Sequence, residues 1–189
     1  MGEKSLRFDL LIAVFALVLS GVASIASVYQ AHVISEQFSA TVWPYLTFSV
    51  TSSESTFSLS VANDGLGPAL IRSAWITLDG KPQSSWRSAV LAMLTPLPAT
   101  RGKTATGTYR SISPGEVIRA GVTDEPISLH GFPGLAAALQ GAAVRRGASI
   151  SICYCSLLGR CWMKVWKPLQ DDEPYDVRAC PAPRTILPS

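Results

Sequence analysis

An apolar segment near the N-terminus constrains this chain more than any other feature. Residues 10–29 read LLIAVFALVLSGVASIASVY and contain no charged side chain. At a rise of about 1.5 Å per residue, a helix of this length spans a hydrocarbon core about 30 Å thick. The sequence therefore predicts a transmembrane helix at residues 10–29. The folded domain must form from the residues that follow it.

The charges on either side of this segment predict its orientation. Lys4 and Arg7 precede it, whereas residues 30–59 contain neither Lys nor Arg. The positive-inside rule then places residues 1–9 in the cytoplasm and the C-terminal domain outside it. Small residues, among them Gly21 and Ser24, leave room for close helix packing, so the bilayer and another membrane protein are the expected partners.

A cleaved signal peptide is the alternative for the same segment. Residues 10–22 resemble the apolar part of a signal peptide, and Ser24 and Ala26 supply small residues at a cleavage site. The apolar stretch nevertheless continues to Tyr29, and no helix breaker follows before Pro44. We therefore expect an uncleaved signal anchor: a cytoplasmic N-terminus (1–9), a transmembrane helix (10–29), a juxtamembrane stalk (30–43), an extracytoplasmic β domain (44–182) and a tail (183–189).

Beyond Pro44 the apolar residues alternate with polar ones, which is typical of half-buried strands. Strands are predicted at residues 45–50, 56–62, 68–78, 108–112, 116–122, 148–154 and 161–166, and the first three are expected to be antiparallel. Short helices are predicted at 84–94 and 133–145. The predicted fold class is mainly β: an antiparallel β-sandwich-like domain with two short helices, with a half-open barrel as the alternative.

Two turns are marked by their residue types. Asn63, Gly65, Gly67 and Pro68 belong to the run NDGLGPA, in which Asn and Gly tolerate positive φ and Pro restricts its predecessor. This run predicts a structural turn, with Asn63 bonded to its backbone. It does not fit a phosphate-binding loop, because a strand and not a helix follows it. Asp79-Gly80 predicts a type I′ turn.

All four cysteines lie near the C-terminal end, at Cys153, Cys155, Cys161 and Cys180. Cys155 and Cys161 flank the turn of the last predicted hairpin, so a disulfide between them would leave Cys153 to pair with Cys180. Disulfides persist in oxidising compartments, which agrees with an exported domain. Their spacing is not a usual one for zinc, although a thiol-redox or metal-binding protein stays an alternative.

The residues give little support for catalysis. His130, placed in a predicted loop, could act as a base, and carboxylates occur at Asp124, Glu125 and residues 171–173. A cell-envelope enzyme or carrier that uses these groups requires them to meet in one pocket. We expect none of them to be catalytic, and no cofactor or metal. The net charge is +3, and the sequence contains no run of five basic residues. We therefore expect no nucleic-acid binding.

The last predicted hairpin carries three large apolar residues, Trp162, Met163 and Trp166. If they are exposed, they mark a surface for a partner. Burial in the core is the alternative and the more common place for such residues.

Several of these motifs together resemble a loose group of uncharacterised bacterial membrane-anchored proteins. The resemblance rests on the N-terminal span, on WPYL at residues 43–46, on NxGxGPAxI at residues 63–71, and on YCS and CW at residues 154–156 and 161–162. It implies a bacterial cytoplasmic-membrane protein with a periplasmic β domain, and it implies no activity. We therefore expect a membrane-tethered, non-catalytic module for interaction, sensing or assembly, whose ligand the sequence does not name.

Overall fold

The computed structural model describes residues 3–95 and 101–182. The chain divides into two compact units, Met1–Thr41 and Val42–Ser189, so the second unit begins two residues before the expected Pro44. The expected tail at 183–189 lies outside the described residues.

The first unit is one continuous helix, α1 (Glu3–Thr41). Within the described part of the chain, α1 is the one helix long and apolar enough to cross a membrane, over Leu10–Phe38. The hydroxyls of Ser24 and Ser27 donate to the carbonyls one turn earlier, at Ser20 and Ala23, over 2.9 Å. These bonds satisfy the polar groups inside the helix, as an apolar environment requires. The helix continues without a break beyond residue 29.

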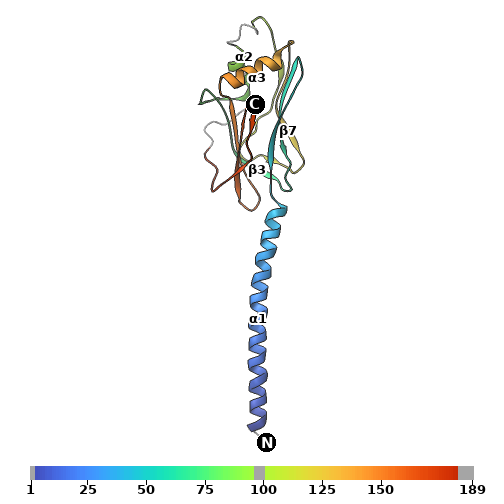
Figure 1. The fold of residues 1–189 in the computed structure, drawn as a ribbon, viewed down its shortest axis with the longest axis vertical. Coiled ribbons are helices and arrows are strands. Elements are labelled where there is room, and N and C mark those ends of the chain that lie inside the picture. The colour runs from blue at the N-terminus through green and yellow to red at the C-terminus, as the bar shows by residue number, and fades with distance from the viewer. Residues whose placement is uncertain (1–2, 96–100, 183–189) are drawn as a thin grey trace. The chain divides into compact units, whose positions relative to one another are not determined.

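The second unit is a β-sandwich with two short helices (Figure 1). In the described residues one sheet has the strand order β1-β2-β7-β5 and the other β10-β9-β8-β3-β4, with β11 beside β9 and β6 beside β3. The strands are β1 (Leu46–Ser52), β2 (Thr56–Asn63), β3 (Ala69–Leu78), β4 (Lys81–Pro82), β5 (Thr106–Tyr109), β6 (Val117–Ile118), β7 (Thr123–His130), β8 (Ser149–Cys155), β9 (Cys161–Lys167), β10 (Gln170–Asp171) and β11 (Tyr175–Val177). The helices are α2 (Trp86–Leu94) and α3 (Leu135–Arg145). The predicted fold class is confirmed.

Strands β1 and β2 follow the predicted alternation. They pair antiparallel from Leu46 opposite Asn63 to Ser52 opposite Phe57. Leu46, Phe48 and Leu59 turn inward and are buried. The sheet thus presents one apolar face to the other sheet.

The third predicted strand lies in a different sheet from the first two. β3 pairs with β8, antiparallel, and not with β2. The run at residues 63–68 therefore carries the chain from one sheet to the other, which is a correction to the expected three neighbouring strands. Alternation indicates which residues are buried, but it does not indicate which strand is the neighbour.

The prediction missed β7, an inner strand of the first sheet. It placed a strand at 116–122 and a loop around His130, whereas β6 covers two residues and His130 is the last residue of β7. Pro126 lies inside β7 and has no N–H for a strand ladder. The register between β2 and β7 shifts at that point, because Leu59 faces Ile127 while Val61 faces Asp124. This bulge accommodates the proline.

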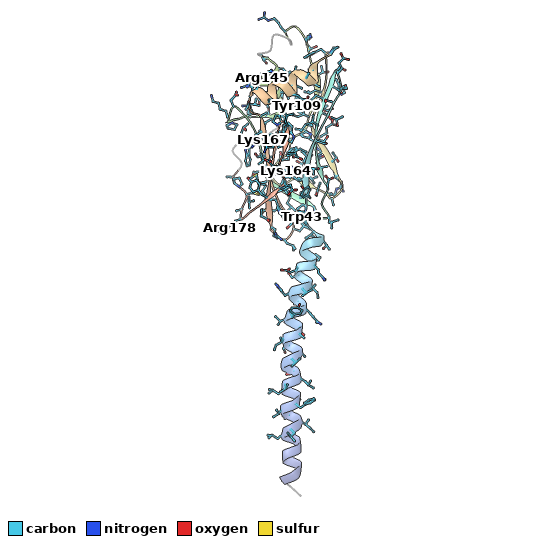
Figure 2. The ribbon with its side chains drawn as sticks, in the orientation of Figure 1. Trp43, Tyr109, Arg145, Lys164, Lys167 and Arg178 are labelled. Atoms are coloured by element: carbon cyan, nitrogen blue, oxygen red, sulfur yellow. A yellow bond between two sulfur atoms is a disulfide. The ribbon has the colours of Figure 1, made fainter. Side chains whose placement is uncertain are left out.

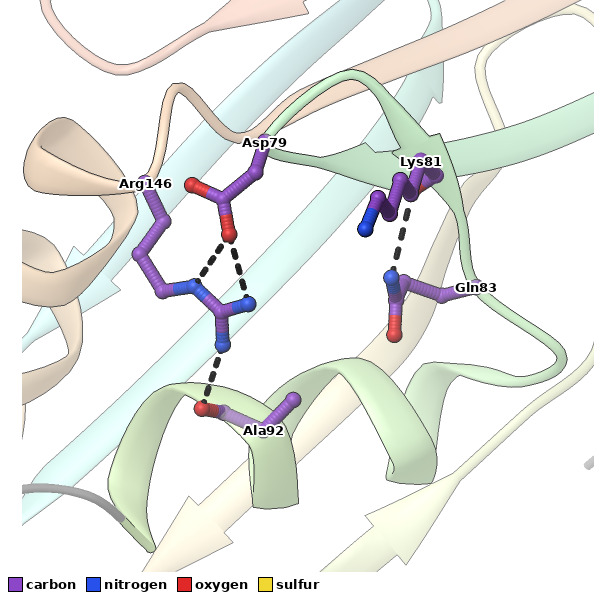
Figure 3. A network of polar contacts seen from close by, with 5 residues as sticks. All are labelled: Asp79, Lys81, Gln83, Ala92 and Arg146. Atoms are coloured by element: carbon purple, nitrogen blue, oxygen red, sulfur yellow. Dashed lines mark hydrogen bonds and ion pairs between the residues drawn. The ribbon is translucent and has the colours of Figure 1, made fainter.

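Both predicted helices form, and they lie together at one end of the domain (Figure 1). α2 begins with a capping box between Ser85 and Ser88. Arg146, directly after α3, donates two hydrogen bonds to Asp79 Oδ2, at 2.6 and 2.8 Å, and one to the carbonyl of Ala92 at 2.6 Å (Figure 3). One guanidinium thus joins the turn after β3 to the ends of both helices.

The core has two parts, one on each face of the second sheet. The larger part fills the space between the sheets, and Tyr154 lies in it fully buried. Its hydroxyl accepts a hydrogen bond from the Leu46 backbone N–H at 3.3 Å, and burial raises the pKa of Tyr154 to about 12. The smaller part, on the outer face, joins Trp75, Cys153 and Met163. Val177 of β11 and Cys180 in the C-terminal segment pack against that outer cluster.

Asn63 is fully buried and connects three segments of the backbone. Its Oδ1 accepts hydrogen bonds from the N–H groups of Tyr45 and Gly65, both at 3.1 Å. Its Nδ2 donates to the carbonyls of Gly67 at 2.8 Å and Ile118 at 2.9 Å. The predicted role of Asn63 in its own turn is confirmed. In addition, it holds the chain where it enters the sandwich and the end of β6.

The glycines of this turn are required by close approach of two backbones. A side chain at Gly65 would overlap the Trp43 carbonyl, and one at Gly67 would overlap the backbone of Val42. The N–H groups of Leu66 and Gly67 both donate to the Trp43 carbonyl, at 2.9 and 3.2 Å. The turn at residues 63–68 is therefore bound directly to the first residues of the domain.

We expect Asn63→Ala to lower the free energy of unfolding of the β domain by about 3–5 kcal/mol, because it leaves two part-buried donors and two buried acceptors without their partner. Asn63→Asp should be as damaging, since a carboxylate cannot donate to Gly67 and Ile118. Chemical denaturation of the full chain measures both. The matched control in the same turn is Leu66→Ala, an exposed site that bonds through its backbone, where a change within about 0.5 kcal/mol is expected. Equal effects at the two positions would contradict the role of Asn63.

Candidate functional site

The strongest candidate site is an apolar pocket of about 170 Å³ inside the sandwich. Both sheets and both helices of the domain contribute to it. Its described lining residues are Val50, Phe57, Leu59, Ile76, Val90, Met93, Ile127, Leu139, Gln140, Ala143, Val144, Ala148, Ile150, Trp166, Pro168 and Leu169. Gln140 is the polar member of that set. Protein interiors are normally filled to crystal density, so an apolar space of this size is a feature that needs an explanation.

The size and chemistry of the pocket define what it can hold. An engineered apolar cavity of about 150 Å³ stays dry and takes up benzene. A pocket of about 170 Å³ therefore accepts a hydrocarbon group of roughly six to eight carbon atoms. Such a lining provides little to stabilise a charge, and water gains few hydrogen bonds there.

Leu169, between β9 and β10, has an unusual backbone and exposure for a lining residue. Its side chain is 96% exposed, and its φ of 66° lies in the left-handed region. That conformation costs an L-residue about 1–2 kcal/mol, and a fully exposed leucine gains nothing from burial. Backbone strain of this kind concentrates at ligand-binding sites. Leu169 is the second residue of a two-residue turn between the paired Lys167 and Gln170, and it lies with its side chain exposed at the edge of the pocket.

A buried charge holds the strand that follows Leu169. Lys164 of β9 is 1% exposed (labelled in Figure 2). Its ammonium lies 2.7 Å from Asp171 Oδ1 and donates to the Asp172 carbonyl, also at 2.7 Å. A buried ammonium requires such partners. Asp171 thus has a structural role, which accounts for part of the acidic run at residues 171–173.

The residues of the enzyme alternative do not meet. Asp124 and His130 lie near opposite ends of β7, six residues apart, which at about 3.4 Å per residue is about 20 Å. Asp124 is buried and pairs with Arg110 at 3.0 Å. Asp171 belongs to the other sheet. The common pocket that this alternative requires is therefore not formed by the residues described.

The structure places two of the three apolar residues of the last hairpin in the core, which was the more common of the two expected places, and not on a partner surface. Trp162 and Met163 are both 6% exposed, so neither offers a surface to a partner. They point to opposite faces of β9: Trp162 stacks with Tyr154 at 5.9 Å between the sheets, and Met163 joins the outer cluster. Trp166 is half-buried and lines the pocket. Burial on both sides of the sheet explains why two successive residues are apolar.

The four cysteines form two disulfides, Cys155–Cys161 and Cys153–Cys180. These are the pairs expected from the hairpin. The sulfurs of Cys155, Cys161 and Cys180 all lie within 4.8 Å of one another, which is close enough for a shared metal ion. A metal requires thiolates, however, so this set could hold one only after reduction.

Comparison of the chain with protein-family models, curated proteins and solved structures gives no match. The resemblance to membrane-anchored bacterial proteins therefore stays a prediction, and the site has to be interpreted from its own chemistry.

The sequence contained signals for part of this site. The alternation of Val50, Phe57 and Leu59 indicates an inward face, but not that the space behind it is unfilled. Alternation along β9 also places Lys164 on the same side as Trp162 and Trp166, which signals a buried charge. Leu169 has no such signal, because a positive φ at leucine is not encoded by its residue type.

We expect Leu169→Asn to raise the free energy of unfolding by about 0.5–1 kcal/mol, since Asn tolerates the left-handed conformation and no buried surface is lost. Leu157→Asn is the matched control: this turn leucine is also exposed, its φ is not positive, and a change within about 0.5 kcal/mol is expected. Chemical denaturation measures both. A loss of stability in Leu169→Asn would mean that Leu169 packs over the empty pocket in solution.

Proposed function

We propose that this chain is a membrane-tethered, non-catalytic binding module whose β domain holds a hydrocarbon chain of an amphiphile in the pocket between its sheets. The observation that carries the proposal is the pocket itself, with about 170 Å³ of apolar space and a strained, exposed leucine at residue 169. The described lining contains no acid, base or nucleophile for a reaction, which supports binding over catalysis.

The membrane anchor supports this choice of ligand. A domain on the same chain as a transmembrane helix stays near a bilayer, where hydrocarbon chains are the most abundant apolar groups. Insertion of a chain end of roughly six to eight carbon atoms would bury it at about 0.8 kcal/mol per methylene. The headgroup would stay outside, because the lining offers no partner for a charge.

The proposed location is a bacterial cytoplasmic membrane, with the N-terminus in the cytoplasm and the β domain in the periplasm. Lys4 and Arg7 before the apolar segment support this orientation. The two disulfides support an oxidising compartment for the domain. An interaction of α1 with another membrane protein belongs to the same proposal, and the small residues in the span support it.

A fatty acid that carries bromine at the end of its chain tests the pocket, because bromine quenches tryptophan on contact and Trp166 lines the pocket. With the full chain in bilayers, we expect saturable quenching, weakened at least about tenfold in Ala143→Leu, which fills the pocket. Ala137→Leu makes the same change at an exposed position of α3 and should bind as the parent does. Equal quenching in all three proteins would place the probe in the bilayer and contradict the proposal.

The topology is tested by labelling thiols in cells. We expect the four cysteines to react with a membrane-impermeant maleimide only after reduction and opening of the outer layer, in a membrane-bound protein of 20.2 kDa. A Ser5→Cys variant should label only after the inner membrane is disrupted. Labelling of the native cysteines without reduction, or a soluble shorter form, would contradict an anchored, oxidised domain.

A further inference from the structure

The two disulfides lie so close together that sulfur atoms of different bridges are almost in contact. Cys155 Sγ lies 3.9 Å from Cys180 Sγ, although each is bonded to another cysteine. Cys153 and Cys155 are two residues apart on β8, so their side chains point to the same face of the sheet. Two independent structural bridges do not need this proximity.

The four sulfurs differ in their access to solvent. Cys153 is fully buried, and Cys155 and Cys161 are 4% and 8% exposed. Cys180 is half-buried and lies in the C-terminal segment. A thiol from outside the protein therefore reaches the Cys153–Cys180 bridge at Cys180.

Cys180 stays near the sheet if its bridge opens. β11, which ends three residues before it, pairs with β9 from Tyr175 opposite Met163 to Val177 opposite Cys161. This strand pairing is made by the backbone and involves neither sulfur atom of the bridge. A reduced Cys180 is therefore held close to Cys155 and not released with the tail.

We propose that these four cysteines form a thiol–disulfide exchange site that reacts with an external dithiol and passes the disulfide from one pair to another. One thiolate of the dithiol attacks Cys180 Sγ, and Cys153 leaves with the electron pair and takes up a proton. The second thiol of the dithiol then displaces Cys180, so that the dithiol is oxidised and Cys153 and Cys180 are reduced.

The second step is internal and involves no net oxidation. The Cys180 thiolate attacks Cys155 Sγ, the bond between Cys155 and Cys161 breaks, and Cys161 leaves as a thiolate that is then protonated. The product has a Cys155–Cys180 bridge and free thiols at Cys153 and Cys161. The C-terminal segment stays attached throughout, and the new thiol at Cys161 lies beside the exposed turn at residues 157–160.

Limited reduction of the full chain in membranes by dithiothreitol tests this. After quenching with an alkylating reagent, peptide mapping should find Cys155–Cys180 in about a tenth or more of the two-electron-reduced protein, with alkylated Cys153 and Cys161. At that abundance, the free energy of the form with the Cys155–Cys180 bridge is within about 1.4 kcal/mol of the forms with a native bridge. Two-electron-reduced protein that contains only native bridges would overturn the proposal.

A variant tests the internal step without any reductant. In Cys161→Ser, the free Cys155 should attack Cys180 and give a mixture of Cys153–Cys180 and Cys155–Cys180, with a ratio independent of protein concentration. The control is Cys155→Ser with Cys161→Ser, which keeps the Cys153–Cys180 bridge and leaves no attacking thiol. A Cys161→Ser protein that keeps only Cys153–Cys180 would contradict exchange. Failure here leaves the lipid pocket untouched, because the two sites share no residue.

Discussion

The four hydrogen bonds of Asn63 are the constraint on which the rest of the domain depends. One side chain binds the entry of the chain at Tyr45, its own turn at Gly65 and Gly67, and the end of β6 at Ile118. This turn carries the chain from β2 in one sheet to β3 in the other. The bonds of Asn63 therefore fix the position of these two strands relative to each other. A buried amide with all of its partners specifies one arrangement, since any other leaves polar groups unpaired.

The sequence predicted the strands and turns of this fold better than it predicted which strands pair with one another. The alternation of Leu46, Phe48 and Leu59 and the residues of the 63–68 turn define strands and a turn by local chemistry alone. The membership of β3 in the second sheet depends on its pairing with β8, whose residues lie 72 to 85 positions later in the chain, which no local pattern contains. β7 was missed for a different reason: Pro126 normally excludes an inner strand, and a bulge in its pairing with β2 compensates for it.

The pocket was not predictable, because it arises from what the core side chains leave unfilled. Alanines 143 and 148 line it where larger residues would close it. Neither alanine is marked by any sequence pattern. The space arises because they face Val50 and Trp166 across the sandwich without filling the gap. The disulfides are the opposite case, since the hairpin places Cys155 opposite Cys161 and leaves one partner for Cys153. The sequence does not predict, however, that Cys155 Sγ lies only 3.9 Å from Cys180 Sγ of the other bridge.

A buried lysine outside the pocket lining, Lys164, holds the segment that follows the pocket mouth. Leu169 gains no packing, and its positive φ belongs to the two-residue turn between the paired Lys167 and Gln170. Lys164 holds the segment just beyond this turn from the interior, by binding both Asp171 and the carbonyl of Asp172. This ion pair adds little net stability, since Asp171 is 47% exposed, but it defines a position because the buried ammonium would lose both of these partners if the segment moved. An apolar residue at 164 would fill the same space, but it would no longer bind Asp171 and Asp172 beside the pocket mouth.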